Sequence, residues 1–126
     1  MVDAGAFVEQ WVRHWNDHDV DAVLEHFAPD VTFSSPVAAQ LLPGSDGVIR
    51  GRAALRDYWA TALGLIPDLH FEVVASYVGV NTLVINYRNQ KSNLVSEVLI
   101  FEGSLVVQGH GTYPAGDHNP AGARQA

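Results

Sequence analysis

The residues best suited to chemistry in this chain lie near its C-terminal end, on two adjoining strand-like segments. Residues 94–101 and 104–113 alternate apolar and polar side chains, and the Glu-Gly pair between them predicts a two-residue hairpin turn. In that register Glu97, Gln108 and His110 share one otherwise apolar face of a sheet. Such polar groups are costly to bury unless they are hydrogen-bonded or reach a cavity. The spacing therefore predicts that these three groups are hydrogen-bonded or reach a cavity, and it makes them the leading candidates for a functional site.

Other roles for these two residues stay open. A register shift by one residue would separate Glu97 from His110, because it moves one strand's side chains to the other face of the sheet. Glu97 could instead be a surface residue paired with Arg88. His110 could be a core or interface histidine whose hydrogen bonds are satisfied.

The composition argues against several other kinds of function. The net charge of −7, with one lysine and six arginines, argues against nucleic-acid binding, which needs a basic surface. Without cysteine the chain has no disulfide, thiolate zinc site or cysteine nucleophile, and it lacks a Gly-x-Ser-x-Gly elbow. His14 and His18, with Asp17 near them, could chelate a metal, but they lie on a polar face typical of solvent exposure. We therefore expect no metal and no cofactor.

No segment predicts contact with a membrane. Apolar runs fall well short of the ~20 residues needed to span a bilayer, and the N-terminus lacks the basic start and apolar stretch of a signal peptide. We expect a cytoplasmic protein.

The elements that must position the candidate residues are helices followed by hairpins. Apolar residues at three- and four-residue spacing predict the helices, and alternation predicts the strands. The predicted helices cover residues 6–15, 20–27 and 51–66, a short strand covers 31–33, and four longer strands cover 69–78, 82–89, 94–101 and 104–113. Asp19 is placed to cap the second helix and Pro29 to stop it.

This order of elements predicts an α+β fold in which three N-terminal helices close a strongly curved antiparallel sheet into a cone around a pocket. Residues 37–50 are interpreted as a loop that lies over the pocket as a lid. Residues 1–113 form a single domain, and residues 114–126, rich in Pro, Gly and Ala, form a mobile tail.

Three stretches of sequence resemble a known family in the same order: WNDHDVDAVLEHFAPDVTFSSP, GRAALRDYWATALG and FEGSLVVQGHGTY. They are similar to the SnoaL-like branch of the nuclear transport factor 2-like superfamily, which includes the polyketide cyclases and the ketosteroid isomerases. The resemblance covers residues 6–113. It implies an α+β cone with an apolar pocket inside and a homodimer formed through the outer face of the sheet.

The resemblance also allows a comparison with ketosteroid isomerase, residue by residue. Trp11 stands where that family has its oxyanion-hole tyrosine, and Trp59 stands where it has a second, supporting tyrosine. Ser35 stands where it has the proton-shuttling aspartate. Glu97 stands where the family has a protonated aspartate that donates to the oxyanion. Because a serine without an activating base cannot replace a carboxylate as proton shuttle, steroid isomerisation is not expected.

The resemblance implies a cofactor-free isomerase, cyclase or dehydratase that acts on a small apolar molecule bearing a carbonyl group. Glu97 or His110 would serve as general base, and Ser35, Gln108 or an indole N–H as oxyanion donor. The residues expected to line the pocket are Trp11, Trp15, Phe33, Ser35, Trp59 and Gln108. Two alternatives remain: a non-catalytic binding module for an apolar molecule, and a dimerisation scaffold whose pocket is filled by its own tryptophans. The aromatic residues could equally be core packing, and Ser35 a turn residue.

Overall fold

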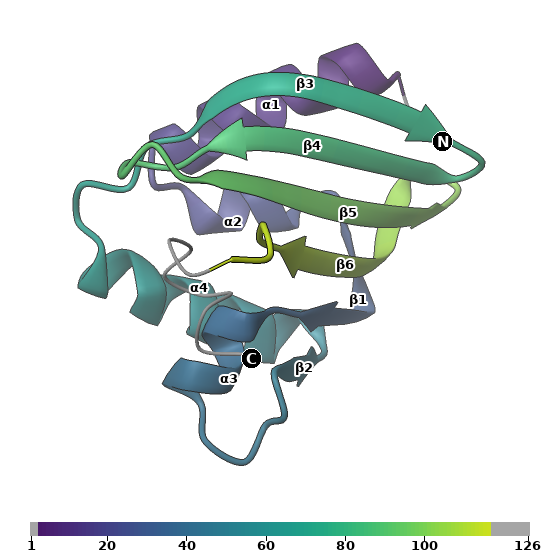
Figure 1. Cartoon of the computed structure of the whole chain (residues 1–126). Helices are drawn as coiled ribbons and strands as arrows, with labels where there is room; N and C mark the ends of the chain where they lie inside the picture. The colour runs from purple at the N-terminus through teal and green to yellow at the C-terminus, as the bar shows by residue number, and fades with distance from the viewer. Residues whose placement is uncertain (1–2, 117–126) are drawn as a thin grey trace.

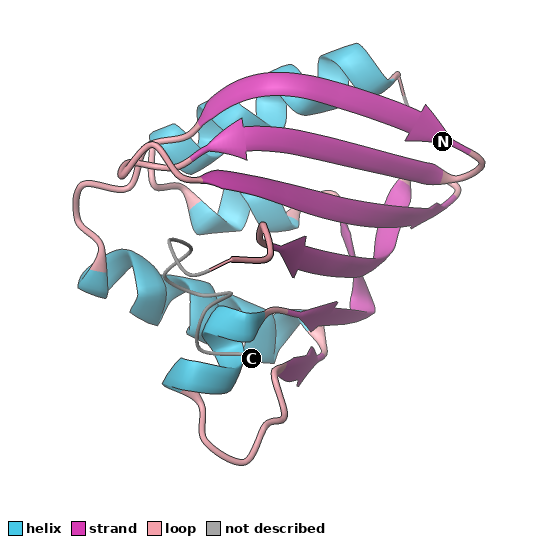
Figure 2. Cartoon of the chain, viewed as in Figure 1, coloured by secondary structure: helices cyan, strands magenta, loops and turns pink. Residues whose placement is uncertain are grey.

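The computed structural model describes residues 3–116 and shows an α+β architecture in which helices precede most of a curved sheet (Figures 1 and 2). The described helices are α1 (Ala4–Asn16), α2 (Val20–Leu24), α3 (Pro36–Leu41) and α4 (Arg52–Leu65). The strands are β1 (Phe27–Ser34), β2 (Val48–Arg50), β3 (Glu72–Gly79), β4 (Thr82–Arg88), β5 (Leu94–Glu102) and β6 (Leu105–Thr112). The expected class, an α+β cone, is confirmed. The expected mobile tail lies largely outside the described residues.

The six strands form one mixed sheet in the order β2-β1-β6-β5-β4-β3. Four of the five neighbouring pairs are antiparallel, and β1 runs parallel to β6. The prediction of a wholly antiparallel sheet is wrong, because the β1–β6 pair is parallel. A parallel pair needs a long connection between its strands, and the whole of the intervening chain provides one.

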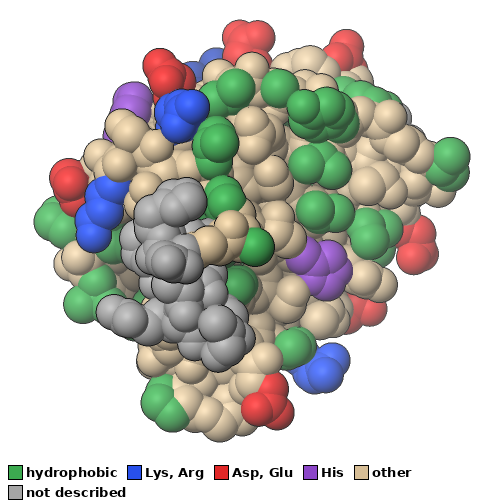
Figure 3. Space-filling model, viewed as in Figure 1, with side chains coloured by type: hydrophobic (Ala, Val, Ile, Leu, Met, Phe, Trp, Pro, Cys, Tyr) green, Lys and Arg blue, Asp and Glu red, His purple; other side chains and the backbone are tan. Residues whose placement is uncertain are grey.

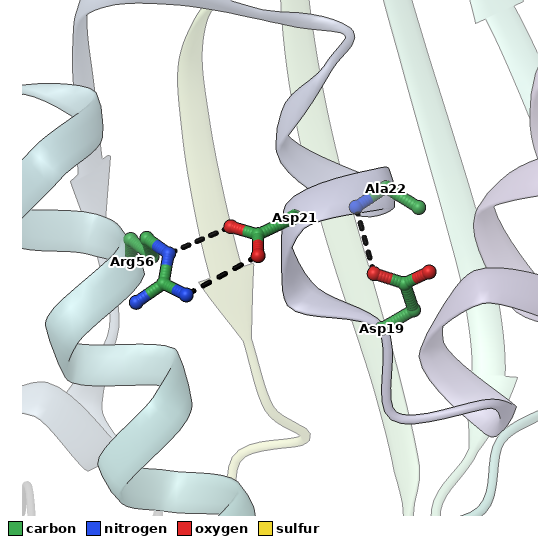
Figure 4. Close-up of polar contacts among 4 residues, drawn as sticks. All are labelled: Asp19, Asp21, Ala22 and Arg56. Carbon is green, nitrogen blue, oxygen red and sulfur yellow. Dashed lines mark hydrogen bonds and ion pairs between the residues drawn. The ribbon is translucent and has the colours of Figure 1, made fainter.

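Local capping interactions set the starts of the first two helices. The Asp3 carboxylate accepts from the backbone N–H of Ala6 at 3.0 Å, and Asp19 accepts from Ala22 at 3.1 Å, which confirms the cap predicted for α2 (Figure 4). Pro29 does not end α2 as expected. The helix stops at Leu24 because the following residues pair in β1.

An ion pair and a pair of hydrogen bonds connect the helices to their neighbours. Arg56 on α4 donates to both carboxylate oxygens of Asp21 on α2, at 2.6 and 3.2 Å (Figure 4). The Asn16 side chain at the end of α1 donates to the carbonyl of Phe71 at 3.0 Å and accepts from its N–H at 2.7 Å. His18 lies 2.8 Å from the carbonyl oxygen of Leu69. These contacts fix the segment that enters β3 against α1.

Residues 37–50 are not the loop that was expected. They contain most of α3 and the whole of β2, which pairs with the end of β1. The Ser35 hydroxyl caps α3 by accepting from the N–H of Val37 at 3.1 Å, and Pro36 occupies the first turn. A six-residue helix has fewer than two turns, too few for its apolar spacing to be recognised.

The β5–β6 hairpin differs from its predicted register. Glu102 pairs with Leu105, so the turn lies one residue later than expected. This change alone gives each β5 residue a partner two positions further along β6, and every side chain stays on its predicted face of the sheet. A bulge at Val107 then adds one unpaired residue, which exchanges the faces. Glu97 consequently pairs with Gly111, and His110 pairs with Val98. The predicted shared face of Glu97 and His110 is wrong.

Helices α1, α2 and α4 pack on one face of the sheet, and no helix of residues 3–116 covers the opposite face over β3–β6 (Figure 1). The core between these layers is rich in aromatic rings, among them Trp11, Trp15, Trp59 and Phe71. Trp15 and Trp59 meet edge to face, with centroids 4.9 Å apart. No helix within residues 3–116 has the length and apolar character needed to cross a membrane.

Candidate functional site

A cavity of about 230 Å³ lies between the helices and the covered face of the sheet. Most of its walls are apolar, and its polar groups are divided between a buried end and an exposed end. The apolar and aromatic walls are Trp15, Phe33, Val37, Trp59, Ala62, Ile66, Leu69, Phe71 and Val95. The polar lining at the buried end comes from Ser35, Tyr58, Tyr87, Glu97 and Tyr113, and that at the exposed end from Gln40, Asn89, Gln90, Lys91 and Asn93.

Glu97 is the central titratable group of the buried end. It occupies an inward position of β5 between Val95 and Leu99, and only 5% of its surface is exposed. Burial raises the pKa of this carboxyl to about 7, and a hydrogen-bonding contact with the Tyr87 hydroxyl partly offsets that rise. Near neutral pH, Glu97 therefore populates both the acid and the carboxylate form.

Gly111 makes room for Glu97 to approach Ser35. A Cβ atom at Gly111 would lie 3.4 Å from Ser35 Oγ and 3.8 Å from Glu97 Oε1. Because glycine has no side chain, the hydroxyl and the carboxyl face the same small volume. Ser35 is 6% exposed and also caps α3. Its cavity position agrees with the sequence prediction, and its role as a local structural residue holds as well.

Three tyrosines complete the buried end. Burial raises the pKa of Tyr113 to about 12 and raises the pKa of Tyr58 and Tyr87 further, and the nearby Glu97 carboxyl adds to each rise. Contacts with the Ser35 hydroxyl oppose the rise for Tyr58 and Tyr113. All three phenols are therefore neutral at physiological pH and can donate hydrogen bonds to a ligand oxygen.

None of these tyrosines was predicted as a site residue, although the alternation of two strands points to Tyr87 and Tyr113. Tyr87 continues the inward alternation of Leu83 and Ile85 on β4. Tyr113 continues the inward alternation of Gly109 and Gly111, which becomes recognisable only once the bulge is known.

Of the predicted site residues, the structure places Trp15, Phe33, Ser35, Trp59 and Glu97 on the cavity. Trp11 is buried one layer away, with its ring centroid 5.6 Å from that of Phe71 and 5.2 Å from that of Tyr87. It supports the cavity wall and does not line it.

His110 and Gln108 lie on the other face of the sheet, apart from the cavity. The Nδ1 atom of His110 is 2.6 Å from Ser34 Oγ, and its Nε2 atom is 3.4 Å from Gln108 Oε1. A neutral imidazole protonated at Nε2 satisfies both contacts. The predicted pairing of His110 with Glu97 is therefore not present, and Gln108 is not an oxyanion donor in this cavity.

Trp15 lines the cavity, and its indole N–H is buried without a hydrogen-bond partner within the described part of the chain. A buried donor without a partner is energetically costly. Between residues 3 and 116, no three His, Asp or Glu side chains are grouped as metal ligands.

The arrangement is suited to proton transfer. An apolar enclosure strengthens electrostatic interactions, a carboxyl with a pKa near 7 can accept or return a proton, and neutral hydroxyls can stabilise negative charge on a ligand oxygen.

Comparisons with known proteins agree with this architecture. Residues 8–116 match the family described as the SnoaL-like domain. A SnoaL-like protein of unknown function from Burkholderia thailandensis is 40% identical, with a TM-score of 0.83 over 89% of this chain and 95% of that one. No curated protein is significantly similar in sequence.

Two more distant structures share the fold alone. A putative polyketide cyclase from Sinorhizobium meliloti is 15% identical, with a TM-score of 0.67 over 85% of this chain and 94% of that one. TerC, co-crystallised with polyporic acid, is 11% identical, with a TM-score of 0.72 over 88% of this chain and 91% of that one.

Proposed function

This chain belongs to the SnoaL-like family, and we propose that it binds a small apolar molecule with a carbonyl group and transfers a proton on it without a cofactor. The observation that carries the proposal is the Glu97 carboxyl, which is buried on the cavity, has a pKa of about 7, and faces the same volume as Ser35. Isomerisation, cyclisation and dehydration share this first step. The fold-level likeness to a putative polyketide cyclase supports cyclisation as one member of the set.

The proposed step is an enolisation. Glu97 in its carboxylate form takes a proton from the carbon next to the ligand carbonyl, and the electron pair of the C–H bond moves to the carbonyl oxygen. The hydroxyls of Ser35, Tyr58 and Tyr113 donate to that oxygen as it becomes negative. Glu97 then returns the proton to another carbon in an isomerisation or to the leaving group in a dehydration. In a cyclisation the enolate carbon bonds to a second carbonyl carbon of the ligand, and Glu97 returns the proton to the oxygen of that carbonyl. Proton and charge are conserved, and no other group is required.

Hydrogen–deuterium exchange tests this step without knowledge of the natural substrate. Small aryl ketones would be incubated with the protein in D₂O, and loss of the proton next to the carbonyl followed by NMR. We expect Glu97→Gln to slow the protein-dependent exchange by about 100-fold or more, the usual contribution of a positioned general base. Exchange by the wild-type protein should rise with pH through about 7, since the carboxylate is the active form.

Glu102→Gln is the matched control for this experiment. Glu102 ends the same strand but is exposed to solvent, so its substitution changes charge without touching the cavity. Equal exchange rates for the Glu97→Gln variant and the wild-type protein would refute the proposed proton transfer.

A second candidate function, binding without catalysis, has one observation in its favour. Because His110 lies on the other face of the sheet, no histidine among residues 3–116 lines the cavity with Glu97 to share the proton transfers. If the protein only binds its ligand, Glu97→Gln would change the ligand affinity. Neither the wild-type protein nor any variant would then accelerate hydrogen–deuterium exchange of a ketone.

We also propose a homodimer formed through the face of the sheet that carries no helix. The strand pairings place Tyr77, Val84 and Val98 in one row across this face, next to His110. Apolar side chains gather over the same strands in the space-filling view (Figure 3). Contiguous apolar surface of this kind is typical of a protein–protein interface.

A further inference from the structure

The exposed end of the cavity differs in charge from the rest of the molecule. The chain has a net charge of −7 and a single lysine, and that residue, Lys91, borders the cavity. Within the described residues it is the one cationic side chain of the lining. Lys91 is exposed and makes no ion pair or side-chain hydrogen bond in the described structure. A cation is therefore available at the opening, in a protein that is otherwise strongly acidic.

The turn that carries Lys91 is held by its own hydrogen bonds. Asn89 Oδ1 accepts from the backbone N–H groups of Lys91 and Asn93, at 3.0 and 3.1 Å. The backbone N–H of Asn89 donates to the carbonyl of Asn93 at 3.0 Å, and Arg88 donates to the carbonyl of Ser92 at 3.1 Å. The backbone at the opening is thus fixed without any contribution from the Lys91 side chain.

Unused amides accompany this cation. The side chains of Gln40, Gln90 and Asn93 border the cavity and form no hydrogen bond within residues 3–116. The Asn89 oxygen is occupied by the turn, whereas its side-chain N–H₂ group is not. In the turn itself, Lys91, Gln90, Asn93 and the side-chain N–H₂ group of Asn89 offer donors along the same part of the cavity rim.

The two ends of the cavity therefore have opposite preferences. An anionic group placed beside Glu97 would face a carboxyl in an apolar enclosure, where like charges repel strongly. The same group placed at the opening would face a cation and amide donors. This difference gives a bound molecule one favourable direction.

We infer that the ligand is an oxo acid: an apolar molecule whose carboxylate binds Lys91 at the opening while its carbonyl group points toward Glu97. The position of the carbonyl rests on the proposed function, whereas the position of the carboxylate does not. The cavity volume of about 230 Å³ is below the ~300 Å³ at which pockets for drug-sized molecules begin, so the molecule is small.

A matched pair of probes tests the site for the carboxylate. 2-Naphthoate and 2-naphthamide have nearly the same shape and differ in charge, and their binding would be measured by quenching of tryptophan fluorescence, since Trp15 and Trp59 line the cavity. We expect the wild-type protein to bind the naphthoate about fivefold more tightly or better, the ratio given by ~1 kcal/mol for a partly exposed charge pair. This preference should shrink as salt is added.

Lys91→Gln should abolish the preference and leave the affinity for 2-naphthamide unchanged. The control is Arg13→Gln, which makes the same change in net charge at an exposed position on α1 away from the cavity. A loss of preference in the Lys91 variant alone supports the inference. Equal affinities of the wild-type protein for the two probes, binding of neither probe, or a preference that survives Lys91→Gln would overturn it.

Glu97→Gln reports the direction of binding. If the carboxylate lies at the opening, this substitution should change the affinity for 2-naphthoate by less than about twofold at pH 8. A gain of fivefold or more would place the carboxylate beside Glu97 and contradict the inference. Neither probe requires turnover, so these results are independent of the ketone exchange experiment.

Discussion

At the scale of single residues, Glu97 connects the cavity to the stability of the fold. Its pKa rises from 4.5 to about 7 because burial disfavours the charged form. Below pH 4.5 the carboxyl is protonated in both the folded and the unfolded chain. Between pH 4.5 and 7 it ionises freely only in the unfolded chain, so the free energy of unfolding falls as the pH rises through this window.

The size of that effect can be predicted for Glu97→Gln. One pKa unit corresponds to about 1.4 kcal/mol, so the wild-type protein should lose about 3 kcal/mol of stability from this group between pH 4.5 and 7. The variant has no carboxyl to ionise at this position. The difference between its free energy of unfolding and that of the wild-type protein should therefore shift in favour of the variant from pH 5 to pH 8. Urea unfolding at the two pH values measures the difference. If Glu97→Gln and the exposed control Glu102→Gln show the same pH dependence as the wild-type protein, the carboxyl is not perturbed.

At the scale of elements, strand β6 depends on two inward glycines that have different neighbours. A Cβ atom at Gly109 would lie 2.9 Å from Phe33 Cδ1 and 3.3 Å from Leu99 Cδ2, which is too close in a packed core. At Gly111 a Cβ atom would meet Ser35 Oγ and Cβ at 3.4 and 3.5 Å and Glu97 Oε1 at 3.8 Å, which are ordinary contact distances.

We therefore predict opposite consequences for the two alanine substitutions. Gly109→Ala should lower the free energy of unfolding by about 1–3 kcal/mol, because Phe33 must move. Gly111→Ala should cost less stability but slow ketone exchange, since its methyl group occupies the volume between the hydroxyl and the carboxyl. Urea unfolding and the NMR exchange assay separate the two effects. A larger loss of stability in the Gly111 variant would contradict this account.

The elements also show how far periodicity can predict a structure. The helix stripe of Trp11 and Trp15 and the alternation around Glu97 repeat over several turns or pairs, and those elements lie where they were expected. Helix α3 and strand β2 are too short for a period to be visible. The bulge at Val107 leaves no local signal, because either face assignment of the following residues alternates equally well.

The candidate site could be predicted from sequence only in part, for the same reason. Glu97, Ser35 and three of the expected aromatic residues line the cavity. Glu97, Trp15 and Trp59 could be predicted because they belong to strongly patterned elements, whereas Ser35 was predicted from the family resemblance. Because both residues follow the bulge, His110 lies on the face away from the cavity and Tyr113 lies on the cavity, the reverse of what an unbroken alternation predicts. Lys91 and its neighbouring amides lie in a turn, where no period indicates which way a side chain points.

At the scale of the whole molecule, the sheet face over which no helix of residues 3–116 packs carries the proposed homodimer interface. Val98 occupies the middle of this face, beside Val84 and His110. If two copies pair here, Val98→Glu should convert a dimer into a monomer of 13.7 kDa, because it introduces two buried like charges. Light scattering after gel filtration measures the mass. Val80→Glu is the control, since Val80 is 91% exposed at the turn between β3 and β4. A wild-type protein that is monomeric at high concentration would refute the proposed interface.

The bulge at Val107 has one more consequence, for the empty space inside the molecule. An uninterrupted ladder beyond Val106 would direct Gln108 and His110 inward, and these bulky side chains would occupy the interior beside Glu97. The extra residue instead directs Gly109 and Gly111 inward, and neither has a side chain to fill the hollow. A single irregular position in one strand thus leaves room for a guest molecule where a regular strand would have built solid core.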